Sequence, residues 1–136
     1  MVLWLRVGTV LLVGGENDPF THIRHAPLKL KCSYCHVNVE TKERAGFPTV
    51  SQCKTCHASM GERKIPVQRV YKVRDFVVFS HARHLAAKAV CADCHGEVYE
   101  KDAQTEARPT TMLACVECHK ERHATQLCNV CHELGQ

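Results

Sequence analysis

The chain has 136 residues and a mass of 15.3 kDa, which suits one small domain or two very small ones. Aromatic residues make up only 6% of it, too few for a large side-chain core, whereas ten Cys and ten His point to a cysteine-based scaffold or a metal site. The net charge of +4 comes from scattered Lys and Arg, and no window offers the roughly 18 to 20 uninterrupted apolar residues that a transmembrane helix requires.

Residues 1–18 form an N-terminal apolar segment. Met1 to Gly15 is apolar except for Arg6 and Thr9. It lacks the basic start and the small-residue cleavage site of a signal peptide, and it is too short to span a bilayer. We expect a remnant of a leader or of a membrane anchor; a strand that packs on a partner subunit is the alternative.

Residues 19–61 form the first of two repeats. It opens with Phe20, His22 and His25 in the frame Phe-x-His-x-x-His, and Phe20 precedes the next Cys by twelve residues. Two Cys-x-x-Cys-His motifs follow, motif 1 at 32–36 and motif 2 at 53–57. Because His residues three positions apart share a helix face but point about 60° apart, one turn can direct them to two different binding partners.

Residues 62–78 link the repeats. The stretch 67–79 is rich in β-branched and aromatic residues, which predicts one strand or a small hairpin. Gly61 and Pro66 mark its beginning.

Residues 79–136 form the second repeat, at a period of 59 residues. Phe79, His81 and His84 restore the opening frame, and motif 3 (91–95), motif 4 (115–119) and motif 5 (128–132) follow. Motif 5 has no counterpart in the first repeat and is preceded by His123. We expect short helices near 53–58, 80–89, 113–123 and 128–133.

The five motifs use every cysteine of the chain. The pairs are Cys32 and Cys35, Cys53 and Cys56, Cys91 and Cys94, Cys115 and Cys118, and Cys128 and Cys131. Two thiols at this spacing can add to the two vinyl groups of haem, and the His that follows can bind the iron. A zinc ribbon or a disulfide framework gives no reason for a His after every second Cys. The sequence therefore predicts five covalently bound haem c groups with their iron.

The remaining histidines complete the ligand count. The proximal ligands predicted from the motifs are His36, His57, His95, His119 and His132. The five others, predicted as distal ligands, are His22, His25, His81, His84 and His123. Met60 and Met112 compete as axial ligands, but five available His make them unnecessary. His123 lies four residues after His119 on the same helical face, so we assign it to the last haem.

Five haems explain how so short a chain can fold. Most apolar side chains would contact porphyrin, Phe20, Tyr34, Phe47, Phe79 and Tyr99 among them, and the chain without haem should be largely unfolded. The predicted fold is mostly irregular, with short α-helices and a small β hairpin. Each haem also adds negative charge. Five haems change the net charge of the protein from +4 to roughly −1 in the oxidised state and −6 in the reduced state, so the charge no longer favours binding to nucleic acid.

Several strings of the chain resemble a known family. Pro19–His25 with motif 1, the sequence Ala45-Gly-Phe-Pro48, and Asp75-Phe-Val-Val-Phe-Ser-His81 are similar to class III multihaem cytochromes c, the cytochrome c3/c7-like family, and to the pentahaem cytochrome subunit of alternative complex III. The resemblance implies haems with two His ligands, little regular structure and electron transfer outside the cytoplasm.

Six-coordinate iron on every haem leaves no open position for a substrate, so we expect an electron-transfer protein and not an enzyme. Two His ligands favour low potentials. The expected partners are other redox proteins, a membrane respiratory complex or neighbouring cytochrome subunits, at a periplasmic or other extracytoplasmic site, with no nucleic acid and no small-molecule substrate. The alternatives are a subunit of a membrane quinol-oxidising complex or of a polymeric haem filament, and a multihaem reductase with one labile distal ligand.

Overall fold

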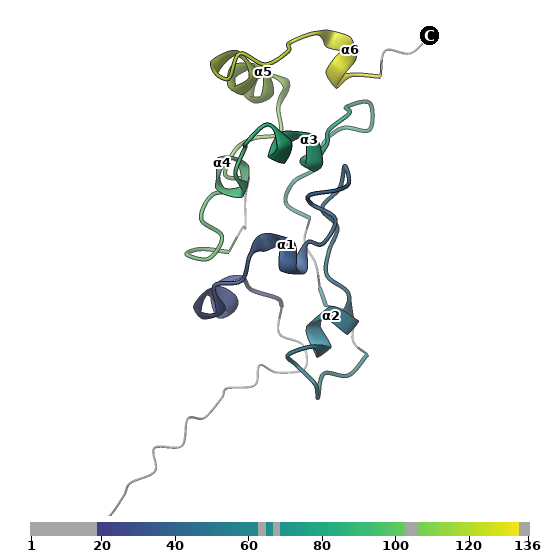
Figure 1. Cartoon of the computed structure of the whole chain (residues 1–136), viewed down its shortest axis with the longest axis vertical. Helices are drawn as coiled ribbons and strands as arrows, with labels where there is room; N and C mark the ends of the chain where they lie inside the picture. Colours follow the sequence, from purple (N-terminus) through teal and green to yellow (C-terminus); the bar gives the residue numbers. More distant parts are fainter. Residues whose placement is uncertain (1–18, 63–64, 67–68, 103–105, 134–136) are drawn as a thin grey trace, which may run out of the picture.

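The computed structural model describes residues 19–62, 65–66, 69–102 and 106–133. The apolar segment predicted over 1–18 lies outside the described residues. Seven short helices connected by irregular chain make up the described part (Figure 1). They are η1 (Ile23–Leu28), α1 (Cys32–Cys35), α2 (Val50–Lys54), α3 (His81–Ala86), α4 (Cys91–His95), α5 (Met112–Glu121) and α6 (Cys128–Cys131). None of the described helices is long and apolar enough to cross a membrane.

Local sequence explains where the helices begin. Thr49 caps α2 through a capping box with Gln52, and the Ser80 and Thr111 hydroxyls accept backbone N–H groups at the starts of α3 and α5. By contrast, α1, α4 and α6 begin at the first Cys of a motif. Mostly irregular chain with short helices is therefore the observed architecture.

The predicted hairpin is not confirmed. Among the described residues of the stretch 67–79, no strand is found, and the β pairing that is present is one isolated antiparallel bridge between Val77 and His132. Two hydrogen bonds flank it, from Val78 N–H to the Cys131 carbonyl (2.9 Å) and from Glu133 N–H to the Phe76 carbonyl (3.0 Å). The β-branched stretch thus pairs briefly with motif 5, far along the chain, and not with itself.

The two repeats hold each other by reciprocal hydrogen bonds. The Asp102 carboxylate accepts the His22 N–H at 2.6 Å, and the Glu43 carbonyl accepts the His81 N–H at 3.0 Å. His22 and His81 are 59 positions apart in the sequence, and so are Glu43 and Asp102. The start of η1 is therefore bound by the loop after motif 3, and the start of α3 is bound by the loop after motif 1. Each repeat thus holds the other at the equivalent position.

Little of the described chain is buried. Val39, at 8% exposure, is the one buried apolar side chain among the described residues, whereas large apolar side chains such as Phe20, Tyr34 and Phe47 remain 41 to 52% exposed. Side-chain packing alone gives this part of the chain almost no hydrophobic core. The fold must therefore be organised around the groups that its histidines and cysteines can bind.

Candidate haem-binding sites

Each motif forms one helical turn. In motifs 1, 2 and 5 the N–H of the His donates to the carbonyl of the first Cys, at 2.9 Å in each case. This i to i−4 bond closes a turn in which the two Cys, three positions apart, lie on the same side of the helix. All ten cysteines are described and carry free thiols. The turn therefore presents two thiols and an imidazole together.

Eight of the ten histidines face each other in four pairs. The distances between ring centroids are 6.4 Å for His22–His36, 6.0 Å for His25–His57, 6.4 Å for His81–His95 and 6.0 Å for His84–His119. Each pair joins one His of a Phe-x-His-x-x-His frame to the His of a motif. The two His of one frame therefore lie opposite the His of two different motifs.

The spacing of the pairs fits two axial ligands of one iron. Two imidazoles bound through Nε2 to opposite sides of a metal, at about 2.0 Å per bond, place their ring centroids about 6 Å apart. Aromatic ring contacts in general span about 4.5 to 7 Å, and Phe79 and His84 lie at the close end of this range with centroids 4.5 Å apart. The four pairs therefore have the separation that a haem iron between them requires.

Backbone carbonyls orient the imidazoles. Nδ1 lies 2.8 Å from Gly46 O in His36, 2.9 Å from Thr21 O in His25 and 2.8 Å from Ser80 O in His84. His81 and His119 make the same kind of bond, to Glu43 O at 2.8 Å and to Thr125 O at 2.6 Å. Because a carbonyl oxygen can only accept, Nδ1 carries the proton in each of these rings. The lone pair of Nε2 is left for a metal.

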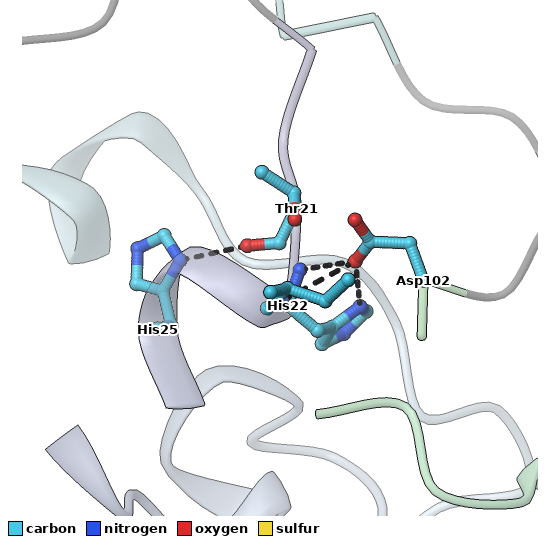
Figure 2. Close-up of polar contacts among 5 residues, drawn as sticks. Thr21, His22, His25 and Asp102 are labelled. Carbon is cyan, nitrogen blue, oxygen red and sulfur yellow. Dashed lines mark hydrogen bonds and ion pairs between the residues drawn. The ribbon is translucent and has the colours of Figure 1, made fainter. Parts of the chain in front are cut away.

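Asp102 organises the beginning of η1 (Figure 2). Its carboxylate accepts the N–H of His22 and, at 3.4 Å, that of Ile23, and it lies 3.8 Å from His22 Nδ1. Burial by itself would raise the pKa of Asp102, but hydrogen bonds from the Thr21 hydroxyl and these two N–H groups outweigh it and lower the pKa. The side chain that positions His22 is thus an ionised carboxylate from the other repeat.

The central imidazoles are kept neutral. Burial, followed by the neighbouring rings of His81, His36 and His22, lowers the pKa of His95. Burial and then His36 lower the pKa of His22, against the opposing effect of Asp102. Neutral imidazole is the form that binds iron, so these surroundings favour the ligating state.

Aromatic rings support the histidines. Phe20 and Phe79 stack on His25 and His84, with centroids 4.9 and 4.5 Å apart and interplanar angles of 29° and 28°. Tyr71 meets His95 edge-on, with ring centroids 4.5 Å apart, and donates from its hydroxyl to the Cys94 carbonyl at 2.9 Å. No motif marks Tyr71, since its role depends on contacts 23 and 24 positions away in the chain.

Motif 5 differs from the other four. The His132 ring meets Phe76, with centroids 5.7 Å apart and an interplanar angle of 30°. Among the ring contacts of the described residues, none brings His123 to His132, although both are described. The structure therefore does not unite the tenth His with the motif to which its place in the sequence assigned it.

The motifs follow one another in space as 2, 1, 3, 4, 5. Besides burial, neighbouring thiols raise the pKa of cysteines in adjoining motifs: Cys53 and Cys56 act on Cys35, Cys91 on Cys32, and Cys131 on Cys115. For Cys94, burial raises the pKa first, Arg108 opposes it, and the thiols of motif 4 add to it. Along the long axis of the molecule, α2, α1 and α4 appear in the same order, and α5 and α6 lie beyond them at the far end (Figure 1).

Comparison with known proteins agrees with this geometry. The profile of the family described as cytochrome c7 and related cytochrome c matches residues 77–133, and that of cytochrome c3 matches residues 24–103. No curated protein matches the chain. Cytochromes of these families bind haem c covalently and are electron-transfer proteins. Since the cytochrome c3 match covers more than half of the sequence, the chain belongs to the cytochrome c3 family of multihaem electron-transfer proteins.

Proposed function

We propose that this chain is a pentahaem cytochrome c that carries electrons between redox proteins outside the cytoplasm. The observation that carries the proposal is the set of four imidazole pairs with centroids 6.0 to 6.4 Å apart, each beside a Cys-x-x-Cys turn. The family supplies the reaction class, and the count of motifs supplies the number of haems.

In this proposal each haem is held by two Cys and by His ligands. The two Cys of each motif attach one haem, and the His that follows binds its iron. His22, His25, His81 and His84 are the proposed distal ligands, of motifs 1, 2, 3 and 4 respectively. When bound, haem iron supplies reversible one-electron chemistry, and two imidazole ligands without Met favour low potential. The distal role predicted for His123 stays a prediction.

Electron transfer through the molecule requires haems that follow one another closely, and the motifs have such an order in space. Helix α2, in which motif 2 begins, lies toward one end of the molecule, α5 and α6 with motifs 4 and 5 lie at the other, and α1 and α4 with motifs 1 and 3 lie between them (Figure 1). Partner redox proteins that dock near the two ends would meet different haems. No motif has to be bypassed on the way between them.

Intact mass of the purified protein tests the proposal directly. We expect the mass of the polypeptide plus five haems, and low-spin absorption spectra in both oxidation states. Cys94→Ala should impair attachment at motif 3, whereas Ala92→Ser in the same turn should leave five haems in place. A wild-type protein with four haems or fewer, or normal incorporation in Cys94→Ala, would contradict the proposal.

The resemblance to the pentahaem subunit of alternative complex III favours a second setting, a subunit of a membrane quinol-oxidising complex. The strings Ala45–Pro48 and Asp75–His81 support it. Native electrophoresis of detergent-solubilised membranes, with haem staining, tests this setting. Haem stain in a band far larger than the chain supports it, and stain in a monomer band alone excludes it.

A further inference from the structure

Three charged side chains join motif 3 to the helix that carries motif 4. The Asp93 carboxylate accepts the Val90 N–H at 3.0 Å and an N–H of the Arg122 guanidinium at 2.7 Å. Arg108 binds the backbone of the same turn twice, with its N–H on the Cys94 carbonyl at 3.2 Å and its Nε on the Asp93 carbonyl at 3.1 Å. Since Arg122 caps the end of α5, the cluster of Asp93, Arg108 and Arg122 lies where the two motifs meet. We call it the junction cluster.

Arg108 is the member of the junction cluster whose charge has no ionic partner. It is half-buried, and among the described residues no carboxylate lies within ion-pair distance of its guanidinium. Asp93 is paired with Arg122. Glu117 and Glu121 line the same cavity as Arg108, between α4 and α5, but both are exposed, so water and salt screen their charges. A positive charge therefore remains at the junction.

The charge of Arg108 acts on thiols of both motifs. Burial raises the pKa of Cys94 and of Cys115, and in both thiols Arg108 acts in the opposite direction, because a guanidinium stabilises a nearby thiolate. In the proposed function these two Cys attach the haems of motifs 3 and 4. A haem gains one negative charge when its iron is reduced, so the same Coulombic attraction stabilises the reduced form of each of these haems.

The first repeat has no charged side chain at the three equivalent positions. These positions are the third residue of the repeat's first motif, the residue before a Pro-Thr pair, and the third residue after the His of its second motif. They hold Asp93, Arg108 and Arg122 in the second repeat, and Tyr34, Phe47 and Met60 in the first. The guanidinium carbon of Arg69 lies 5.9 Å from the centroid of the Phe47 ring, but Arg69 is exposed and its charge is screened. A half-buried charge at the junction thus distinguishes the second repeat from the first.

We infer that Arg108 raises the reduction potentials of the haems of motifs 3 and 4, and so biases electrons in the molecule toward the second repeat. The inference rests on the proposed function. Each haem is reduced by one electron that a donor redox protein supplies, which converts Fe(III) to Fe(II). No bond is made or broken, and no proton is transferred. Two His ligands set the low range in which the potentials lie, and Arg108 sets a difference within that range.

A redox titration of the five-haem protein tests the inference, with the methyl resonances of each haem followed by NMR. At a fixed ambient potential, Arg108→Gln should raise the ratio of oxidised to reduced haem about three- to tenfold at two haems, because one half-buried charge is lost. One of these is the haem of motif 4, which His84→Met identifies by its shifted potential. Arg108→Lys keeps the charge and should leave the ratios close to those of the wild-type protein. Arg69→Gln, the matched control, removes an equal but exposed charge and should also leave them close to the wild-type values.

Asp93→Asn changes the charge at the junction in the opposite sense, because it leaves Arg122 without its carboxylate. We therefore expect a lower ratio of oxidised to reduced haem at motif 3. A purely structural disturbance gives no reason for opposite shifts in Arg108→Gln and Asp93→Asn. Should Arg108→Gln fail to retain its haems, the Asp93→Asn titration decides alone.

Four outcomes overturn the inference. They are unchanged ratios in Arg108→Gln, equal shifts in Arg108→Gln and Arg108→Lys, an equal shift in Arg69→Gln, and an unchanged or higher ratio at motif 3 in Asp93→Asn. Intact mass counts the haems of every protein tested. Fewer than five haems in the wild-type protein contradict the proposed function, whereas five haems with unshifted ratios in the variants contradict this inference only.

Discussion

At the scale of single residues, the imidazoles are oriented before any iron is considered. Five of them donate from Nδ1 to a backbone carbonyl, at 2.6 to 2.9 Å, and so present Nε2. For His25 and His84 the acceptor is the carbonyl four residues earlier, Thr21 O just before η1 and Ser80 O at the N-cap of α3. Ligand orientation is thus encoded locally, which lowers the entropy lost when the iron binds.

Replacing one distal imidazole tests this ligand assignment. In His84→Met we expect five haems and a higher potential for one of them, because a thioether ligand raises the potential of haem iron. A potentiometric titration followed by visible absorption measures it. Arg83→Ala, an exposed position on the same helix, is the control and should leave all potentials unchanged. Unaltered potentials in His84→Met would mean that His84 does not bind iron.

Asp102 should contribute measurably to stability. Asp102→Ala leaves the N–H groups of His22 and Ile23 without their acceptor, so we expect about 1 to 3 kcal/mol of destabilisation at neutral pH. Since the pKa of Asp102 is lowered in the folded protein, its stabilising effect is complete above the ordinary carboxyl range and is lost as the pH falls through the folded-state pKa.

Thermal unfolding of the haem-loaded protein measures the effect of Asp102. The difference in melting temperature between wild type and Asp102→Ala should be large at pH 7 and shrink toward pH 3. Glu40→Ala, at an exposed acidic position between motif 1 and motif 2, is the control and should change little. A pH-independent difference would show that the charge of Asp102 is not what stabilises η1.

At the scale of elements, short helices perform two tasks. Helices α1, α4 and α6 begin at the first Cys of a motif and present its thiols, while η1 and α3 each carry one frame of two histidines. Helices of four to six residues are marginal in isolation, because nucleation costs more than one or two hydrogen bonds return. Caps, contacts between repeats and the cofactors must supply the difference.

Ser80 provides such a cap, and its removal should weaken α3. The Ser80 hydroxyl accepts the Arg83 N–H at 3.3 Å, whereas the bond that orients His84 uses the Ser80 backbone carbonyl and survives in Ser80→Ala. We expect a loss of about 1 kcal/mol in the free energy of unfolding, with unchanged haem spectra. Denaturant titration checks it against Ser59→Ala, at an exposed position. A spectral change would imply that the cap also controls ligation.

The sequence predicts the local elements better than the contacts between them. Short helices are predicted near 80–89, 113–123 and 128–133, where α3, α5 and α6 lie, whereas η1, α1 and α4 fall outside the predicted ranges. That His22 and His25 bind the haems of different motifs stays a prediction. The hairpin predicted from the stretch 67–79 is not confirmed, and among the described residues Val77 of this stretch pairs with His132 of motif 5. Neither the Asp102–His22 bond nor Tyr71 is predictable, because both depend on long-range contacts that no periodicity records.

Counting residues also has a limit that His123 shows. Ten His and five motifs suggest that every His binds iron, but a count does not distinguish a ligand from the residue that ends a helix. The left-handed backbone that His123 shares with Lys29 and Lys88 becomes visible only in the structure. The distal role of His123 therefore stays a prediction.

At the scale of the whole molecule, the two repeats form one continuous arrangement. Motifs 1 and 3 lie together at the centre, where the pKa of His95 is lowered by burial and then by rings of both repeats. Motif 2 lies on one side of this centre, and motifs 4 and 5 lie on the other (Figure 1). The reciprocal bonds of Asp102 and Glu43 join the repeats across the same centre, so the contact that holds the fold also places the haem-binding motifs of the two repeats side by side.

Such a molecule should depend on its cofactors for folding. Val39 is the one buried apolar side chain among the described residues, so side chains bury too little surface to offset the conformational entropy of an ordered chain. We expect the same polypeptide, produced in a host without haem attachment, to show the circular dichroism of a largely unfolded chain and poorly dispersed amide resonances. The haem-loaded protein, measured in the same buffer under reducing conditions, should show dispersed resonances and cooperative unfolding. A cooperative thermal transition in the haem-free chain would mean that packing between the repeats suffices for folding, and that the haems enter sites already formed.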